Sequence, residues 1–229
     1  ILRNYRKILK GHNHKIKNKP ESIFLLIKNK LIMLAAFNRY IVSKKLFHPR
    51  QKILLTVSGG VDSMVLLHLF ETSGFSYGIA HCNFQLRGTD SEKDEELVRK
   101  NASDLGIPSF FVKFDTLEFA RIHGISVEMA ARKLRYEYFE KIRRDNNFDF
   151  IATAHHKDDL AETFFLNLSR KTGIRGLTGI KEKTQNIIRP LLFAGRKEIE
   201  NYARSNNVEY REDYTNDEII YQRNYIRHR

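Results

Sequence analysis

Ile53–Phe70 reads ILLTVSGGVDSMVLLHLF, and no other segment says as much about the architecture of this chain. It begins with five mostly apolar residues, Ile53–Val57, which are typical of a buried strand. A Gly-Gly pair follows, and the apolar run Met64–Phe70 comes shortly after it. The order predicts a strand, a tight turn and a helix, which is the repeating unit of a parallel α/β sheet.

The turn itself has the composition of a phosphate-binding loop. Two glycines let the backbone turn sharply and approach a ligand closely, and two serines add hydroxyl donors. The helix that follows presents unpaired N–H groups and the positive end of its dipole. An aspartate beside a polyanion suits a divalent cation, so we expect magnesium at Asp62. The residues expected to bind the nucleotide are Ser58, Gly59, Gly60, Val61, Asp62 and Ser63.

The loop differs from the widespread phosphate loop G-x-x-x-x-G-K-[ST], because no lysine occurs between Lys52 and Lys93. S-G-G-x-D-S resembles instead the PP-loop of ATP pyrophosphatases, which cleave ATP between its α- and β-phosphates to adenylate a substrate. The alternative is a turn whose glycines serve geometry alone. Both serines, the aspartate and the flanking strand and helix favour the phosphate loop.

Composition excludes several other classes of protein. The 229 residues are enough for one domain with a proper core. The single cysteine, Cys82, excludes an intrachain disulfide and a Cys-x-x-Cys redox or metal pair. Apolar stretches all fall short of the roughly 18 residues that a membrane span needs, so we expect no membrane partner and a cytoplasmic location.

The positive charge is concentrated at the N-terminus. The formal net charge is +13, and residues 1–50 hold 13 of the 40 basic residues but only one acidic residue, Glu21. We expect a basic segment that either meets nucleic acid or forms a solvated tail. Residues 1–32 contain no methionine and stay open as an extension, a gene-model artefact or a targeting segment, which would make the location organellar.

Apolar runs and helix-like stretches alternate along the rest of the chain. We expect strands at 76–81, 109–114 and 148–153, and helices at 91–105, 127–146, 158–169 and 196–206. This alternation predicts an α/β fold with a parallel sheet flanked by helices. We divide the chain into the basic segment 1–50, a catalytic domain 51–192 and a helical extension 193–229. Ligands of such sheets bind at the carboxyl ends of the strands.

Four further motifs follow predicted strands or lie on predicted helices. His81, Asn83 and Arg87 can hydrogen-bond a base, a sugar or a phosphate, or can simply form a structured turn. Arg132 and Arg135 share one helix face, which either clamps phosphate or is solvated.

The other two motifs lie further along the chain. Asp158 and Glu162 are four residues apart on one helix and suit a second metal or nucleotide contact, next to His155 and Asp159. Zinc is disfavoured because neither a His-x-x-x-His pair nor a cysteine completes a site. In the glycine-rich loop at 172–179, Arg175 can contact a polyphosphate or RNA backbone, or the loop can be a plain connector.

Taken in order, eight segments resemble the tRNA(Ile)-lysidine synthase family. They are Ser58–Ser63, His81–Gly88, Ala131–Tyr136, Ala154–Thr163, Gly173–Gly179, Arg189–Leu192, Tyr210–Asn216 and Arg223–His228. The chain departs from the family pattern at Phe84, where a second histidine is commoner, and at Tyr210, which replaces a tryptophan. Members of the family usually continue into C-terminal tRNA-binding regions.

The resemblance implies a ligase that uses ATP and magnesium to adenylate the wobble cytidine of tRNA(Ile) with a CAU anticodon. Free L-lysine then displaces AMP to form lysidine. It implies catalytic roles for Asp62, Arg132 and Glu162. Candidates for binding lysine or tRNA are His81, Asn83, Arg87, Arg135, His155, Asp158, Asp159 and Arg175. Two alternatives stay open, namely another PP-loop ligase such as an NAD-synthetase-like amide former and a non-catalytic tRNA-binding PP-loop protein.

Overall fold

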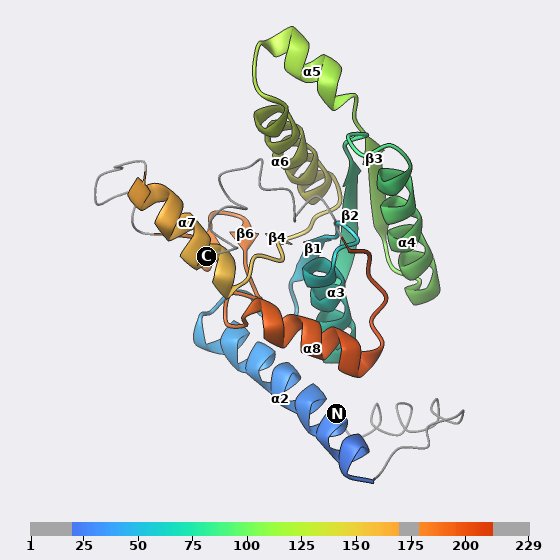
Figure 1. The fold of residues 1–229 in the computed structure, drawn as a ribbon, viewed down its shortest axis with the longest axis vertical. Coiled ribbons are helices and arrows are strands. Elements are labelled where there is room, and N and C mark those ends of the chain that lie inside the picture. The colour runs from blue at the N-terminus through green and yellow to red at the C-terminus, as the bar shows by residue number, and fades with distance from the viewer. Residues whose placement is uncertain (1–19, 170–178, 213–229) are drawn as a thin grey trace.

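The computed structural model describes residues 20–169 and 179–212, and a six-stranded sheet lies at its centre (Figure 1). The strand order is β3-β2-β1-β4-β6-β5. The strands are β1 Lys52–Thr56, β2 Ser76–Asn83, β3 Ser109–Lys113, β4 Phe150–Ala152, β5 Lys183–Thr184 and β6 Ile187–Ile188. Neighbouring strands are parallel except β5 and β6, which pair antiparallel. The predicted α/β fold with a parallel sheet flanked by helices is confirmed, and the antiparallel pair of β5 and β6 is an addition to it.

Seven helices accompany the sheet in the described residues. They are α2 Pro20–Ser43, α3 Val61–Ser73, α4 Thr89–Leu105, α5 Thr116–His123, α6 Val127–Asp145, α7 Lys157–Ser169 and α8 Arg196–Asn206. Most were expected, but α2 and α5 were not. Helix α5 is only eight residues long, and it depends on local capping: Asp115 accepts a hydrogen bond from the Glu118 backbone N–H at 3.0 Å, and Gly124 ends it in a left-handed conformation. At its start β4 is shorter than the strand expected at 148–153, because the backbone N–H of Phe148 instead closes the end of α6.

Both faces of β1, a central strand of the sheet, are covered. Ile53 and Leu55 point into one apolar cluster and Leu54 into the other, and all three are fully buried. This is the alternation of a strand whose two faces are both packed. Helices α2, α3, α4 and α8 contribute to the larger cluster, and α6 covers the opposite face.

The end of the basic N-terminal segment belongs to the core. Phe37 of α2 is fully buried and contacts the rings of Phe70, Phe75 and Phe193. In Figure 1, α2 and α8 lie side by side at the base of the molecule. Residues 1–19 lie outside the described residues, so the nucleic-acid-binding role of this segment stays a prediction, as do the domain boundaries at 50 and 192.

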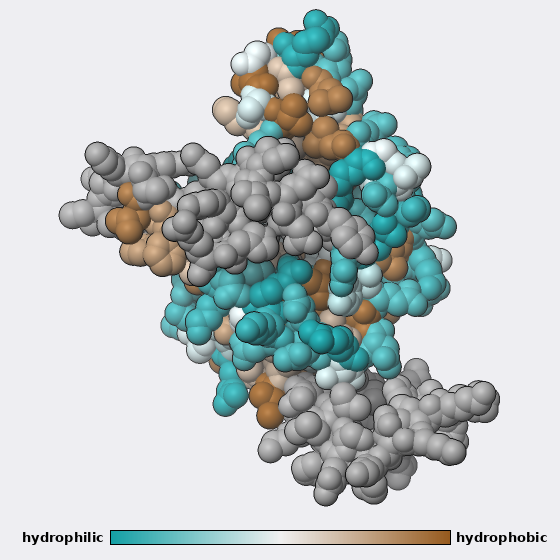
Figure 2. Space-filling model, in the orientation of Figure 1, coloured by the Kyte–Doolittle hydropathy of each residue, from teal (hydrophilic) through white to brown (hydrophobic). Residues whose placement is uncertain are grey.

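The surface is mainly polar in the view of Figure 2, with hydrophobic side chains gathered at the tip formed by α5 and α6. The exposed apolar residues there are Leu117, Ile122, Val127 and Met129. Within residues 20–169 and 179–212, none of the helices combines the length and the hydropathy that crossing a membrane requires.

Candidate nucleotide-binding site

The Ser58–Ser63 loop lies where β1 ends, and its two serines close it. Ser63 Oγ accepts a hydrogen bond from the backbone N–H of Ser58 at 3.1 Å and donates one to the carbonyl of Gly60 at 2.9 Å. Ser58 Oγ lies 3.1 Å from Ser63 Oγ. Ser63 is buried whereas Ser58 is exposed. Ser63 therefore fixes the shape of the loop, and Ser58 is the hydroxyl that a ligand can reach.

Helix α3 begins directly after the two glycines, and its N-cap residue, Gly60, provides no side-chain cap. The N-terminus of such a helix is suited to binding an anion. Gly59 has a φ of +95°, and a Cβ built on it would lie 3.4 Å from Asp94. The loop therefore needs glycine at position 59 for its backbone conformation, since the added Cβ itself would meet Asp94 only at an ordinary contact distance.

Asp62, in the first turn of α3, lies in a charged cluster. Its Oδ2 is 2.7 Å from Nη1 of Arg196, and its Oδ1 is 3.8 Å from Nε2 of His156. Asp159 Oδ2 lies 3.7 Å from the same His156 nitrogen. The structure thus brings Asp62 and Asp159 to one imidazole ring, although they are far apart in sequence.

The first turn of α7 supplies the other carboxylates that we expected at the site. Asp159 accepts a hydrogen bond from the backbone N–H of His156 at 2.8 Å and so caps the helix. Asp158 accepts one from the backbone N–H of Arg196 and so ties α7 to the start of α8. Glu162, one turn further along, is buried with 9% of its surface exposed. Asp158 and Asp159 therefore have structural partners in addition to any ligand role.

His81 and Asn83 are both buried at the end of β2. His81 Nδ1 lies 2.8 Å from the carbonyl of Val57, which can only accept, so Nδ1 carries the proton. Burial lowers the pKa of His81. Asn83 donates to Glu95 at 3.0 Å and accepts from the backbone N–H of Gln85 at 2.9 Å. These contacts hold the segment after β2 in place, and neither side chain is exposed to a large substrate.

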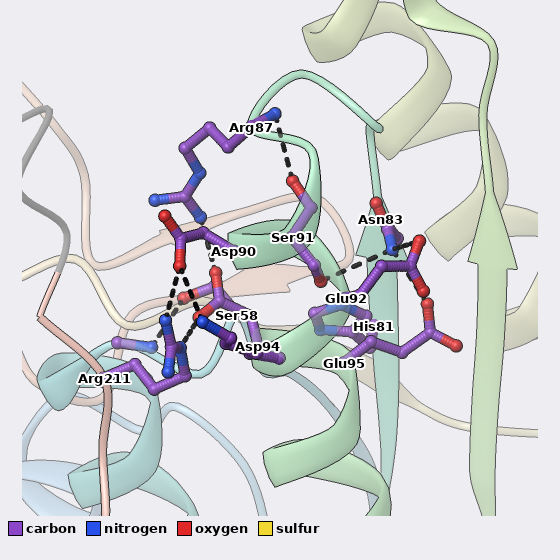
Figure 3. A network of polar contacts seen from close by, with 12 residues as sticks. Ser58, His81, Asn83, Arg87, Asp90, Ser91, Glu92, Asp94, Glu95 and Arg211 are labelled. Atoms are coloured by element: carbon purple, nitrogen blue, oxygen red, sulfur yellow. Dashed lines mark hydrogen bonds and ion pairs between the residues drawn. The ribbon is translucent and has the colours of Figure 1, made fainter.

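A network that sequence reasoning missed surrounds Asp94 of α4 (Figure 3). Arg87 Nη2 lies 2.6 Å from one carboxylate oxygen of Asp94, and Arg211 Nε lies 2.7 Å from the other. Arg211 also bonds Asp90 at 2.9 Å, and its backbone N–H donates to the carbonyl of Gly59 at 3.0 Å. The network therefore holds Asp94 against the loop. Arg211 lies in a segment that we had noted only for its resemblance.

A second group of charges surrounds α6. The Arg132 guanidinium lies 5.0 Å from the ring centroid of Tyr136, and that of Arg135 lies 5.1 Å from the ring of Phe84. Burial lowers the pKa of Arg189, which directly follows β6, and the positive charge of Arg132 lowers it further. Burial also lowers the pKa of His155 to about 4, and the charges of Arg189 and Arg135 add to this.

We call Arg132, Arg135, Arg189 and His155 the basic cluster. Neither Arg132, Arg135 nor Arg189 forms an ion pair with a carboxylate in the described part of the chain. Arg189 was not among the expected site residues, although it begins the segment Arg189–Leu192 that we had noted. Arg175 lies outside the described residues.

An open glycine loop at the carboxyl edge of a parallel sheet, next to the N-terminus of a helix, defines an α/β domain that binds nucleotide phosphates. The chain belongs to the PP-loop family, because the family model described as the PP-loop domain matches residues 33–229. This match supports ATP as the nucleotide. The match begins inside α2, in agreement with the burial of that helix in the core.

Similar proteins include two bacterial tRNA(Ile)-lysidine synthases. That of Porphyromonas gingivalis is 45% identical over 188 residues, which cover 81% of this chain and 41% of the relative. That of Bacteroides thetaiotaomicron is 46% identical over 189 residues, which cover 82% and 44%. The chain thus spans about two fifths of the length of these curated relatives.

A solved structure also resembles this one. It is a U34-tRNA thiolase, NcsA from Methanococcus maripaludis, described with its 4Fe-4S cluster. The TM-score is 0.66 at 18% sequence identity, and the match covers 82% of this chain and 66% of the thiolase. This likeness supports the fold. The single cysteine of the present chain cannot provide the several thiolates that a protein-bound iron–sulfur cluster takes.

Proposed function

We propose that this chain forms the ATP-using catalytic part of a tRNA(Ile)-lysidine synthase. The observation that carries the proposal is the open loop Ser58–Ser63 at the sheet edge, within a chain about 45% identical to curated enzymes of that name. In this proposal the protein acts in the cytoplasm, and the organellar alternative applies if the basic segment is a transit peptide.

The loop would hold the β- and γ-phosphates of ATP. The N–H groups at the start of α3 and the Ser58 hydroxyl are suitable donors. The 2-carbonyl oxygen of the wobble cytidine then attacks the α-phosphate, and the bond between the α- and β-phosphates breaks. Pyrophosphate leaves with its negative charge stabilised by the same donors.

Asp62 fits a magnesium ion that arrives with the nucleotide. Magnesium at such sites takes one or two carboxylates together with phosphate oxygens. The carboxylates of Asp62 and Asp159 are close together, since both lie within 3.8 Å of the same His156 nitrogen. Within residues 20–169 and 179–212, no group of three or more His, Cys, Asp or Glu side chains could hold a metal unaided. When bound, magnesium would offset the charge that builds on the leaving pyrophosphate.

In the second step the amine of free L-lysine attacks C2 of the adenylated cytidine, and AMP leaves with the oxygen that had been the base carbonyl. The ammonium of lysine needs a carboxylate partner. Glu162 is the carboxylate of α7 that is buried, one turn beyond Asp158 and Asp159, and a buried carboxylate is a strong partner for an ammonium group. We therefore assign Glu162 as the first candidate for the lysine pocket.

The basic cluster is our candidate for contact with the anticodon of tRNA(Ile). Arg132 and Arg135 are exposed, and each stands over an aromatic ring. Arginine binds phosphate bidentately, and aromatic rings stack on unpaired bases. Phe84, which replaces the commoner histidine, supplies one of these rings.

The proposal is tested by incubating the protein with a tRNA(Ile) transcript carrying a CAU anticodon, ATP and radiolabelled lysine. We expect label on the RNA and none on a transcript whose wobble base is uridine. Normal ATP binding without label transfer would contradict the lysidine proposal and leave a PP-loop nucleotide site. RNA-independent release of pyrophosphate would favour an amide-forming ligase, and complete lack of release would favour a non-catalytic tRNA-binding protein.

A further inference from the structure

The loop has no lysine of its own, yet a cation lies at its mouth. Arg196 reaches the first turn of α3 from the start of α8, 134 residues away in sequence. We propose that Arg196 is the phosphate-binding cation of this loop and that it transfers from Asp62 to the β- and γ-phosphates when the nucleotide enters. The inference rests on the proposed function in one respect, that the loop holds those two phosphates.

The position of Arg196 suits this role. Its Nη1 lies 2.7 Å from Asp62 Oδ2, and Asp62 belongs to the helix turn whose N–H groups face the anion. Its Nε donates to Glu200 at 2.8 Å. Its Nη2 forms no hydrogen bond with a residue in the described ranges, so donors of the guanidinium are available for a ligand.

The base of the side chain is fixed while its head can move. The Arg196 backbone N–H is held by Asp158, and the next turn of α8 is buried through Ile199 and Tyr202. The side chain of Arg196 is 41% exposed. An ion pair with that exposure contributes little to stability, so exchanging one carboxylate for a polyphosphate costs little. The guanidinium group of arginine binds two phosphate oxygens in the same bidentate geometry in which it binds a carboxylate.

The other arginines beside the loop are less suited to this exchange. Arg87 and Arg211 both bind Asp94, whose side chain is only 10% exposed. Moving either of them would leave a largely buried carboxylate with one partner fewer. Asp62 is more exposed, at 24%, and loses less when Arg196 leaves. Release of Asp62 would also free this carboxylate for the cation that accompanies ATP.

The test compares ATP with AMP, because AMP lacks the β- and γ-phosphates. Binding of each to wild type, Arg196→Gln and Arg196→Lys is measured by isothermal titration calorimetry in the same magnesium buffer. We expect Arg196→Gln to weaken ATP binding by about 10- to 100-fold, the range for one charge-assisted contact, and to leave AMP binding within about twofold. Arg196→Lys should fall between, because it keeps the charge and loses the fork.

Arg204→Gln is the matched control. Arg204 lies on the same helix and also contacts Glu200, at 3.7 Å, but has no contact with Asp62. It should bind ATP like wild type, and thermal unfolding will show whether each variant is folded. Equal losses for ATP and AMP, or unchanged ATP binding in Arg196→Gln, would overturn the inference, as would a wild type that binds no ATP. A wild type that binds ATP but transfers no lysine would overturn only the lysidine proposal.

Discussion

The loop and the basic cluster differ in how their charges are compensated. At the loop, Asp94 is held by Arg87 and Arg211, and Asp62 by Arg196, all at 2.6 to 2.7 Å. In the basic cluster, Arg132 and Arg135 have aromatic rings as neighbours and no ion-pair partner in the described residues. The carboxylates at the loop are therefore neutralised within the protein, whereas the arginines of the cluster keep a positive charge that can attract a large polyanion.

Among the changes at the loop, Gly59→Ala should have the largest effect on ATP affinity. The new Cβ would stand at φ +95° and 3.4 Å from Asp94. We expect ATP affinity to fall by about 100-fold or more and the free energy of unfolding by about 2 kcal/mol. Calorimetric titration and chemical denaturation measure the two. Gly74→Ala is the control, since Gly74 also has a positive φ but open space around it, and it should keep its ATP affinity.

Arg211→Ala should have the next largest effect. It leaves Asp94, which is nearly buried, with Arg87 alone, and removes the Asp90 contact. We expect a loss of about 2 kcal/mol in the free energy of unfolding, measured by urea denaturation.

Arg211→Lys should recover only part of this loss, because the two carboxylates are held by the guanidinium fork. Lys100→Ala removes an ion pair to Glu209 on the protein surface and should change stability little. If Lys100→Ala lowered the free energy of unfolding as much as Arg211→Ala, the distinction between the buried and the exposed ion pairs of α4 would be wrong.

Lowering the pH should destabilise the folded protein at the basic cluster, because burial within the cluster keeps His155 neutral. The pKa of His155 is lowered to about 4 in the folded protein, against a usual 6.5, so the unfolded chain takes up the proton first. Stability contributed by neutral His155 is complete above pH 6.5 and is lost as the pH falls toward 4. We expect about 1 kcal/mol less between pH 7.5 and 5.5.

The measurement is the difference between wild type and His155→Gln in urea denaturation at each pH, which removes the contribution of the carboxylates. His123, which is exposed, offers the matched control variant His123→Gln. A pH profile of His155→Gln parallel to that of wild type would contradict the assignment.

Arg132→Ala and Arg135→Ala should have the smallest effects, and only on RNA binding. Each removes an exposed cation, so we expect about a threefold to fivefold loss of tRNA affinity, a shallower salt dependence and unchanged ATP affinity. Filter binding at several salt concentrations measures this. Lys141→Ala, at the other end of the same helix, is the control. Loss of ATP affinity in Arg132→Ala would show that the two regions form one site.

Local pattern was enough to predict the loop and most of the elements. The apolar run before Ser58 and the glycines after it are short-range signals, as are the strand and helix periods that follow. Helix α5 lacked such a signal because it is short. The partners of the loop could not be predicted, since Arg196 and Arg211 lie 134 and 117 residues from the carboxylates that they bind. His81 and Asn83 share one face of β2 and are buried there, and their contact with a ligand stays a prediction.

The central claim is that Ser58–Ser63 supports cleavage of ATP between its α- and β-phosphates on behalf of an RNA. The most direct measurement uses ATP labelled at the γ-phosphate, with and without a tRNA(Ile) transcript, and separates the labelled products by chromatography. The account predicts labelled pyrophosphate, formed only when the transcript is present. Labelled inorganic phosphate, or pyrophosphate formed equally without RNA, would contradict it.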